Sequence, residues 1–194
     1  MKKKTAALAL AVILVLSAAA GGTMAYLIDT TDNVKNIFVS GKVNATLDEA
    51  VVDSNGQATA ARGTGNSYTV IPGCKAAKDP TVHIEKGSLP CYVYVCVEDT
   101  LTDGDVDYTV DATWTQVKAS GTKTVYRYNG IVDARSAQQD LTVFNGVTYD
   151  YTKITEANIA DQSGNINVSA YVVQAVGVTE ADVQAAALAY FEVT

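Results

Sequence analysis

The run Cys91-Tyr92-Val93-Tyr94-Val95-Cys96-Val97, directly after Pro90, decides the fold. β-Branched and aromatic residues, which favour strands, fill this run. Side chains alternate between the two faces of a strand, which gives two sets: Tyr92, Tyr94 and Cys96 on one face, and Cys91, Val93, Val95 and Val97 on the other. Both faces are largely apolar. This is typical of a central strand packed on both sides, or of a strand with one packed face and a tyrosine-covered outer face.

Shorter runs with strand character lie on both sides of this segment. Val43, Ala45 and Leu47 alternate with polar residues, which predicts a half-buried strand. The same reasoning predicts strands over 68–71, 81–85, 108–110, 112–117, 124–128, 141–144, 147–151 and 166–176. Residues 53–66, rich in Gly, Ser, Asn and Ala, are expected to form a loop or a hairpin connection. Asn129-Gly130 and Asn145-Gly146 predict tight hairpin turns.

One helix is expected, over residues 179–188. Thr179 is a suitable N-cap with Asp182 near the third helical position, and the segment is rich in alanine. Many short strands, regular turn signals and no alternation of strands with helices predict an all-β protein, an antiparallel β-sandwich with a short C-terminal helix. We see no internal repeat and no second domain, so residues 26–194 are predicted to form a single β-sandwich domain.

Residues 1–25 have the layout of a secretory signal peptide. Three lysines open the chain, residues 5–20 are almost wholly apolar and uncharged, and Gly21-Gly22 breaks the helix. The small residues that follow place the cleavage between Ala25 and Tyr26. The alternative is an uncleaved membrane anchor. The apolar run is short for a membrane span and no basic stop-transfer cluster follows it, and both observations favour a cleaved signal. We expect a secreted protein of the extracellular matrix or cell surface, with membrane contact only through the uncleaved signal.

The chain is acidic. It has 14 Lys and Arg against 21 Asp and Glu, a net charge of -7. Removal of the signal peptide takes away three lysines and no acid, which leaves 11 basic and 21 acidic residues and a net charge of -10. Such a surface repels nucleic acid and anionic membranes, so we expect neither as a partner.

The three cysteines allow one disulfide and leave one thiol over. Cys91 and Cys96 are five residues apart in a predicted strand and therefore point to opposite faces, which disfavours a bond between them. Cys74 with one of these two is the favoured disulfide. The alternative is that all three are small buried hydrophobic side chains.

Four stretches together resemble the TasA/camelysin family of exported Gram-positive proteins. The first is residues 22–26 with the residues spaced after them up to Gly41, and the second is Ile71-Pro72-Gly73 followed by residues 78–82. The third and fourth are residues 88–95 and 170–175. The resemblance implies a jelly-roll-like sandwich, a dedicated signal peptidase of the SipW type, and extracellular fibres of the biofilm matrix. It also implies that the N-terminal segment of one subunit completes the sheet of the next.

Residues 26–41 are therefore the candidate donor strand. Its apolar side chains are Tyr26, Leu27, Ile28, Val34, Ile37, Phe38 and Val39. A strand freed by cleavage has unpaired N–H and C=O groups, and a sheet that lacks one edge offers matching ones. Addition of that strand in trans makes a head-to-tail contact that need not close, so filaments result. The alternative is that the strand pairs within its own subunit.

The sequence gives little support to an enzyme. His83 is the single histidine, whereas a zinc peptidase site takes two or three, and no nucleophile elbow Gly-x-Ser-x-Gly is present. We assign no catalytic residue, no metal ligand and no cofactor. A secreted camelysin-like metallopeptidase remains the alternative function that the family resemblance implies.

Two further clusters have an alternative reading as binding sites. Acidic residues gather at 99–107 and are candidate Ca²⁺ ligands, although their spacing misses the EF-hand template and favours a solvated loop; they are Asp99, Asp103, Asp105 and Asp107. The second cluster is a set of aromatic residues on several predicted strands: Tyr92, Tyr94, Tyr108, Trp114, Tyr126 and Tyr128. They could line a ligand groove, as in a monomeric surface-binding module. We favour the alternative that they pack against one another across strands.

Overall fold

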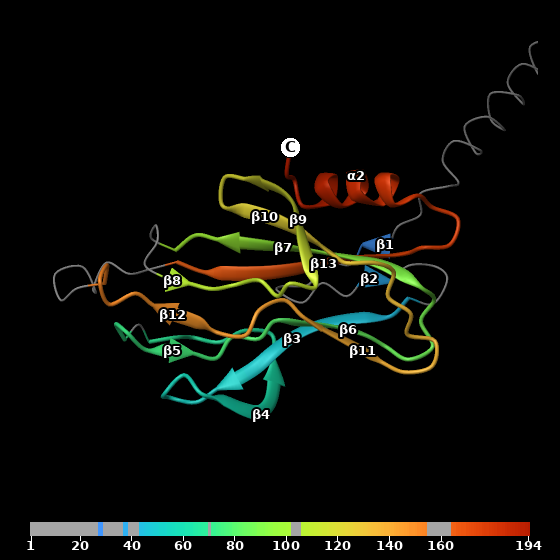
Figure 1. The fold of residues 1–194 in the computed structure, drawn as a ribbon. Helices are drawn as coiled ribbons and strands as arrows, with labels where there is room; N and C mark the ends of the chain where they lie inside the picture. The colour runs from blue at the N-terminus through green and yellow to red at the C-terminus, as the bar shows by residue number, and fades with distance from the viewer. Residues whose placement is uncertain (1–26, 29–36, 39–42, 70, 102–105, 155–163) are drawn as a thin grey trace, which may run out of the picture.

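Two four-stranded antiparallel sheets form the body of the computed structural model (Figure 1). The structure describes residues 27–28, 37–38, 43–69, 71–101, 106–154 and 164–194. The upper sheet has the order β13 (Ile166–Gln174), β7 (Cys91–Asp99), β10 (Lys123–Tyr128), β9 (Trp114–Ser120). The lower sheet has the order β11 (Gln139–Thr142), β6 (Thr81–Ile84), β3 (Ala45–Val52), β4 (Ala58–Gly63).

Smaller elements complete the architecture. A short sheet of β5 (Lys75–Ala76), β12 (Val147–Tyr149) and β8 (Val106–Asp107) lies at one end of the sandwich. The chain passes from one main sheet to the other between β6 and β7, between β10 and β11, and between β11 and β13. These crossings give the jelly-roll-like antiparallel sandwich with a short C-terminal helix that we predicted.

The central strand β7 is packed on both faces, which is the first of the two arrangements that its sequence indicates. Cys91, Val93, Val95 and Val97 lie in the apolar core between the two sheets, together with Val82, Ile84 and Leu141 of the lower sheet. Tyr94 and Cys96 face the other way, into a second core with Val125, Tyr171 and Val173. The two-residue period of the sequence therefore assigned both faces correctly.

The helix α2 (Glu180–Tyr190) covers the outer face of the upper sheet (Figure 1). Its N-cap is Thr179, whose side-chain oxygen accepts a hydrogen bond of 3.2 Å from the backbone N–H of Asp182. Val183 and Ala187 bury their side chains in the second core, and Phe191 closes it after the helix ends. The predicted start and cap of the helix are confirmed.

Several predicted local features were wrong. The described residues of 68–71 form no strand, and in 108–110 a single bridge joins Val110 to Phe144. β5 was missed, and β4 lies inside 53–66, where it pairs with β3 as a hairpin. Asn129-Gly130 and Asn145-Gly146 do turn the chain, since both glycines have positive φ. However, the strands that flank each pair belong to different sheets and do not form hairpins.

The sandwich is closed along one side. The indole Nε1 of Trp114 in β9 donates a hydrogen bond of 2.9 Å to the carbonyl oxygen of Thr142 in β11. Next to it, the backbone N–H of Asp111 donates to the carbonyl of Val143 at 2.8 Å. These contacts tie the β9 edge of the upper sheet to the β11 edge of the lower sheet. The opposite side, with β13 above β3 and β4, opens into a groove.

The described part of the candidate donor segment is extended. β1 (Leu27–Ile28) and β2 (Ile37–Phe38) pair with each other in antiparallel fashion, with Leu27 opposite Phe38. Tyr26, Val34 and Val39 lie outside the described residues, as does the signal segment 1–25. Among the residues that the structure describes, no helix is long and apolar enough to span a membrane.

Candidate functional site: a groove along the free edge of β13

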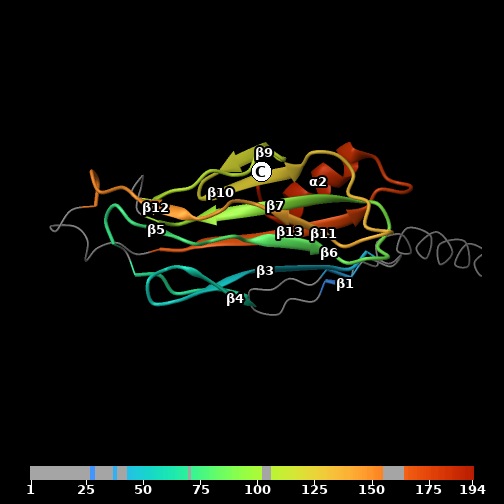
Figure 2. The same cartoon turned by 60° about the horizontal axis from the view of Figure 1, so that its bottom comes forward.

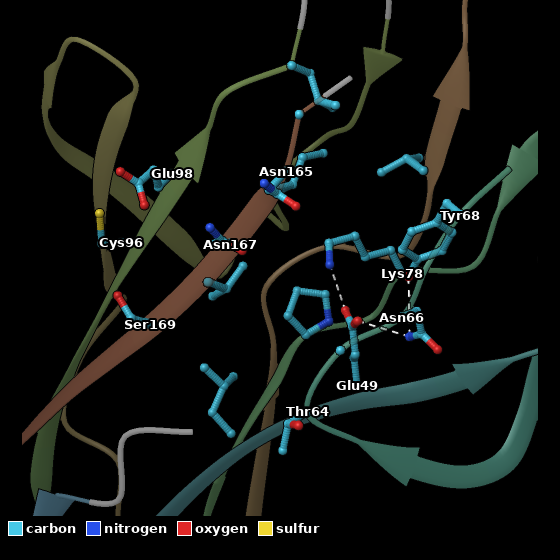
Figure 3. A pocket seen from close by; sticks show the side chains of 18 of the residues that line it. Glu49, Thr64, Asn66, Tyr68, Lys78, Cys96, Glu98, Asn165, Asn167 and Ser169 are labelled. Atoms are coloured by element: carbon cyan, nitrogen blue, oxygen red, sulfur yellow. Dashed lines mark hydrogen bonds and ion pairs between the residues drawn. The ribbon is translucent and has the colours of Figure 1, made fainter. Parts of the chain in front are cut away.

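A groove of about 860 Å³ runs along the open side of the sandwich (Figure 3). One wall is the first half of β13, residues 166–169, and the other is made by β3 together with residues 64–68. Val106, Val147 and Tyr149 line the end nearest the β5–β12–β8 sheet. The groove thus lies where the two main sheets are not joined to each other.

The edge of β13 in this groove presents backbone groups that no described strand pairs with. The N–H of Thr100 donates to the carbonyl of Asn165 at 2.9 Å, and the N–H of Ala175 donates to that of Pro90 at 2.7 Å. The register between β13 and β7 is unbroken between these two pairs. Since hydrogen-bonded and non-hydrogen-bonded pairs alternate in an antiparallel ladder, odd-numbered residues of β13 bond to β7. The N–H and C=O groups of even-numbered residues, Ile166 and Val168 among them, therefore point away from β7 into the groove.

This edge lacks the protections that exposed strand edges usually carry, which are charges, proline, bulges and short length. β13 has nine residues in continuous register, with no charge and no proline. By contrast, the β9 edge carries Lys118 and a register shift, and β11 has four residues including Asp140. In the part of the chain that the structure describes, no strand pairs with the outer edge of β13.

A buried ion pair forms the opposite wall of the groove. Lys78 Nζ lies 2.8 Å from Glu49 Oε2, and the two side chains are 11% and 7% exposed. Asn66 holds the other carboxylate oxygen, since its Nδ2 donates to Glu49 Oε1 at 2.9 Å and to the carbonyl of Ala50 at 2.8 Å. Figure 3 shows these side chains converging across the groove from β13. Glu49 thus has both oxygens bound, as a buried carboxylate requires.

Tyr68 completes this polar wall. Its hydroxyl donates to the carbonyl of Ala77 at 3.0 Å, and Lys78 Nζ lies 5.6 Å from the centre of its ring. Burial, followed by the negative charge of Glu49, raises the pKa of Tyr68 well above its usual value. The phenol therefore stays a neutral hydrogen-bond donor, and the wall has a fixed pattern of charge.

Sequence reasoning missed these groove residues. Glu49 did carry a signal, because the period that buries Val43, Ala45 and Leu47 also points Glu49 inward, where an acid needs a partner. Nothing in the sequence identifies that partner as Lys78, which is 29 residues away. The aromatic residues of the groove are Tyr68, Tyr149, Tyr190 and Phe191.

The six aromatic residues considered as a groove lining pack between strands instead. Tyr108 stacks on Phe144 with ring centres 4.9 Å apart, and Trp114 meets the edge of Tyr128 at 5.3 Å. Tyr126 packs against the core between the sheets, and Tyr92 and Tyr94 belong to the core under α2. Packing across strands, the favoured reading, is correct for this set.

The expected disulfide is not present. All three cysteines are described and none is bonded to another: Cys74 is exposed, and Cys91 and Cys96 are buried. Cys91 and Cys96 lie in separate cores on opposite faces of β7, which explains why they cannot meet. Burial raises the pKa of Cys91 to about 12, so its thiol is unreactive.

The residues considered for catalysis and metal binding do not form a metal site in the described residues. No group of three or more His, Cys, Asp or Glu side chains there is placed to hold an ion. His83 lies on β6, on the outer face of the lower sheet, between two carboxylates. Of the acidic cluster, Asp99 ends β7 and Asp107 ends β8, while Asp103 and Asp105 lie outside the described residues.

We compared the chain with protein-family models, with curated proteins and with solved structures, and found no match. The groove combines a strand edge, a wall of mixed polar and apolar side chains, and one buried ion pair. This combination suits an extended peptide segment, whose backbone can pair with β13 while alternate side chains enter the groove.

Proposed function

We propose that this protein is a secreted structural subunit of extracellular biofilm-matrix or surface fibres that assembles through the free edge of β13. The incoming strand is segment 26–41 of a second copy. A signal peptidase of the SipW type makes it available by cutting between Ala25 and Tyr26. The observation that carries the proposal is the uncharged, continuous edge of β13, with outward-pointing backbone groups at Ile166 and Val168.

The chemistry of the groove fits this segment. Residues 26–41 are rich in β-branched and aromatic residues and contain no proline, so their backbone can supply the ladder that β13 lacks. Their apolar side chains match the apolar side chains that line the groove, which include Leu47, Val147 and Tyr149. The resemblance to the TasA/camelysin family supports the same mode of assembly.

The arrangement of the donor and acceptor favours a filament over a closed dimer. Figure 1 places β1 and β2 toward one end of the sandwich and the β5–β12–β8 sheet toward the other, and Figure 2 shows the same separation of β1 from β5 and β12. The groove extends to that second end, where Val106 and Tyr149 line it. A donor at one end and an acceptor toward the other make a heterologous contact, which can repeat without closing.

The test uses protein that begins at Tyr26 and a proline at Val168. Proline lacks an N–H and fits at strand edges. The N–H of Val168 points away from β7, so Val168→Pro keeps the pairing with β7 and blocks only the incoming strand. Val168→Ala is the matched control, since it removes the same apolar side chain but keeps the N–H. Electron microscopy and sedimentation measure assembly.

We expect the parent chain and the alanine variant to form fibres and the proline variant to stay unassembled. The proline variant keeps its own donor segment, so small amounts of it should cap growing fibres and shorten them. Trimming the chain up to Gly41 should also abolish growth, because it removes the donor. A parent chain that remains monomeric at every concentration and pH, or a proline variant that assembles as the alanine variant does, contradicts the proposal.

A further inference from the structure

A row of charged side chains crosses the outer face of the lower sheet, with one member from each strand. In the spatial order of the strands they are Asp140 on β11, His83 on β6, Asp48 on β3 and Arg62 on β4. The row is continuous, because each member contacts the next. It lies on the opposite side of the lower sheet from the core.

His83 has a carboxylate on both ring nitrogens. Its Nδ1 lies 2.6 Å from Asp140 Oδ1, and its Nε2 lies 2.8 Å from Asp48 Oδ1. A neutral imidazole has one N–H donor and one nitrogen lone pair, so it can satisfy only one of these oxygens. The imidazolium donates to both. The His83 and Asp48 side chains are 15% and 27% exposed, whereas Asp140 is 57% exposed, so water replaces Asp140 more easily than Asp48.

The two carboxylates connect His83 to the rest of the sheet. Asp48 also accepts a hydrogen bond from Arg62 Nε, and Arg62 Nη1 lies 2.9 Å from Asp79 Oδ2. Asp79 in turn accepts from the backbone N–H of Ala50 at 2.6 Å. In the sequence, Asp48 precedes Glu49 and Asp79 follows Lys78, and Glu49 and Lys78 form the ion pair of the groove wall. Arg62 therefore holds the same two chain segments together on the outer face of the lower sheet.

We propose that His83 is a proton-operated clasp of the lower sheet: its imidazolium holds β11 and β3 to β6, and loss of its proton at alkaline pH releases one carboxylate and loosens the sheet. This device goes beyond the proposed fibre assembly and does not depend on it. It predicts that the edge strand β11, which pairs only with β6 among the described elements, loosens first.

The charged and polar groups around His83 set the direction of its pH response. Burial acts to lower the pKa of His83, but hydrogen bonds to Asp140 and Asp48 outweigh it and raise the pKa above 6.5. Arg62, on the far side of Asp48, opposes the positive charge, and Gln138 donates to Asp140 at 2.7 Å. The His83 hydrogen bond in turn lowers the pKa of Asp140 below 3.8.

Linkage then fixes the pH window of the clasp. The contribution of His83 is complete below the unfolded pKa of about 6.5 and is lost as pH rises through the higher folded pKa. The contribution of Asp140 is complete above its unfolded pKa of about 4 and is lost as pH falls through the lower folded value. The clasp is therefore closed at mildly acidic pH and opens as pH rises through the folded pKa of His83.

The single histidine makes the test direct. NMR titration of the His83 ring in the folded chain gives its pKa, and denaturant unfolding from pH 5 to pH 9 gives the stability. Each unit by which the folded pKa exceeds the unfolded one changes the unfolding constant about tenfold. His83→Gln removes the titrating group, Asp140→Asn removes one carboxylate, and Asp133→Asn, at an exposed pair with Arg135, is the control.

We expect the pKa of His83 to lie above 6.5, to fall in Asp140→Asn, and to be unchanged in Asp133→Asn. The loss of stability between pH 6.5 and pH 9 should vanish in His83→Gln and persist in the control. The protection factors of the β11 amides, which compare their exchange with that of an unfolded peptide at the same pH, should fall over the same range in the parent chain. A His83 pKa at or below 6.5, or a stability profile that His83→Gln does not alter, overturns the proposal.

Discussion

Lys78 Nζ and Glu49 Oε2 lie 2.8 Å apart in the wall of the groove, on segments that are 29 residues apart in the chain. Glu49 belongs to β3, and Lys78 lies between β5 and β6. Removing two charges from water costs several kcal/mol per ion, which their attraction repays only when the geometry is good. The pair therefore holds two distant segments in one arrangement. Its disruption should lower the stability of the fold and change the shape of the groove.

The first prediction concerns this ion pair. Lys78→Met leaves the buried carboxylate of Glu49 without its cation and should lower the free energy of unfolding by about 3–5 kcal/mol. The double variant Glu49→Leu with Lys78→Met leaves no lone charge and should recover most of that loss. Denaturant unfolding, followed by the fluorescence of the single tryptophan, Trp114, measures both. A single variant as stable as the parent would contradict the assignment of a buried, coupled pair.

The second prediction compares two turn glycines. Gly130 and Gly146 have φ of 97° and 99°, a region that disfavours a side chain. A Cβ at Gly130 would meet no atom within 4 Å, whereas a Cβ at Gly146 would lie 3.0 Å from the carbonyl oxygen of Ala76. Gly130→Ala should therefore lower the free energy of unfolding by about 1–2 kcal/mol through backbone strain alone. Gly146→Ala should lower the free energy of unfolding by more, because the strand β5 must also move. Thermal unfolding of the two variants measures the difference, and equal losses of stability would argue against the contact with Ala76.

The third prediction concerns the thiols. Cys74 is exposed and should react at once with a thiol reagent in the native protein. Cys91 and Cys96 are buried, and the pKa of Cys91 is raised to about 12, so both should react only after unfolding. The number of cysteines that react is counted without and with denaturant. We expect one reactive cysteine in the native protein and three in the unfolded protein. An intact mass 2 Da below that of the reduced chain would indicate the disulfide that the structure lacks.

These residues also show how far the sequence could predict the fold. The two faces of β7 and the cap of α2 follow from local periodicity and chemistry, and both were predicted correctly. Asn145-Gly146 was recognised as a turn but not as a crossing, because a turn signal does not say which sheet the next strand joins. The groove depends on contacts between distant segments, such as Lys78 with Glu49, and the charged row on the lower sheet depends on similar contacts, such as His83 with Asp48. No local pattern predicts those partners.

The last prediction concerns the helix that covers the upper sheet. Thr179 caps α2 by accepting the N–H of Asp182 at 3.2 Å. Thr179→Ala leaves that N–H without its side-chain acceptor and should lower stability by about 1 kcal/mol, whereas Thr179→Ser keeps the hydroxyl and should lose far less. Because α2 shields Tyr94, Cys96 and Val173, fraying of its first turns should also increase amide hydrogen exchange there, while exchange in the lower sheet stays unchanged. Equal stability of the alanine and serine variants would mean that the cap does not hold the helix in place.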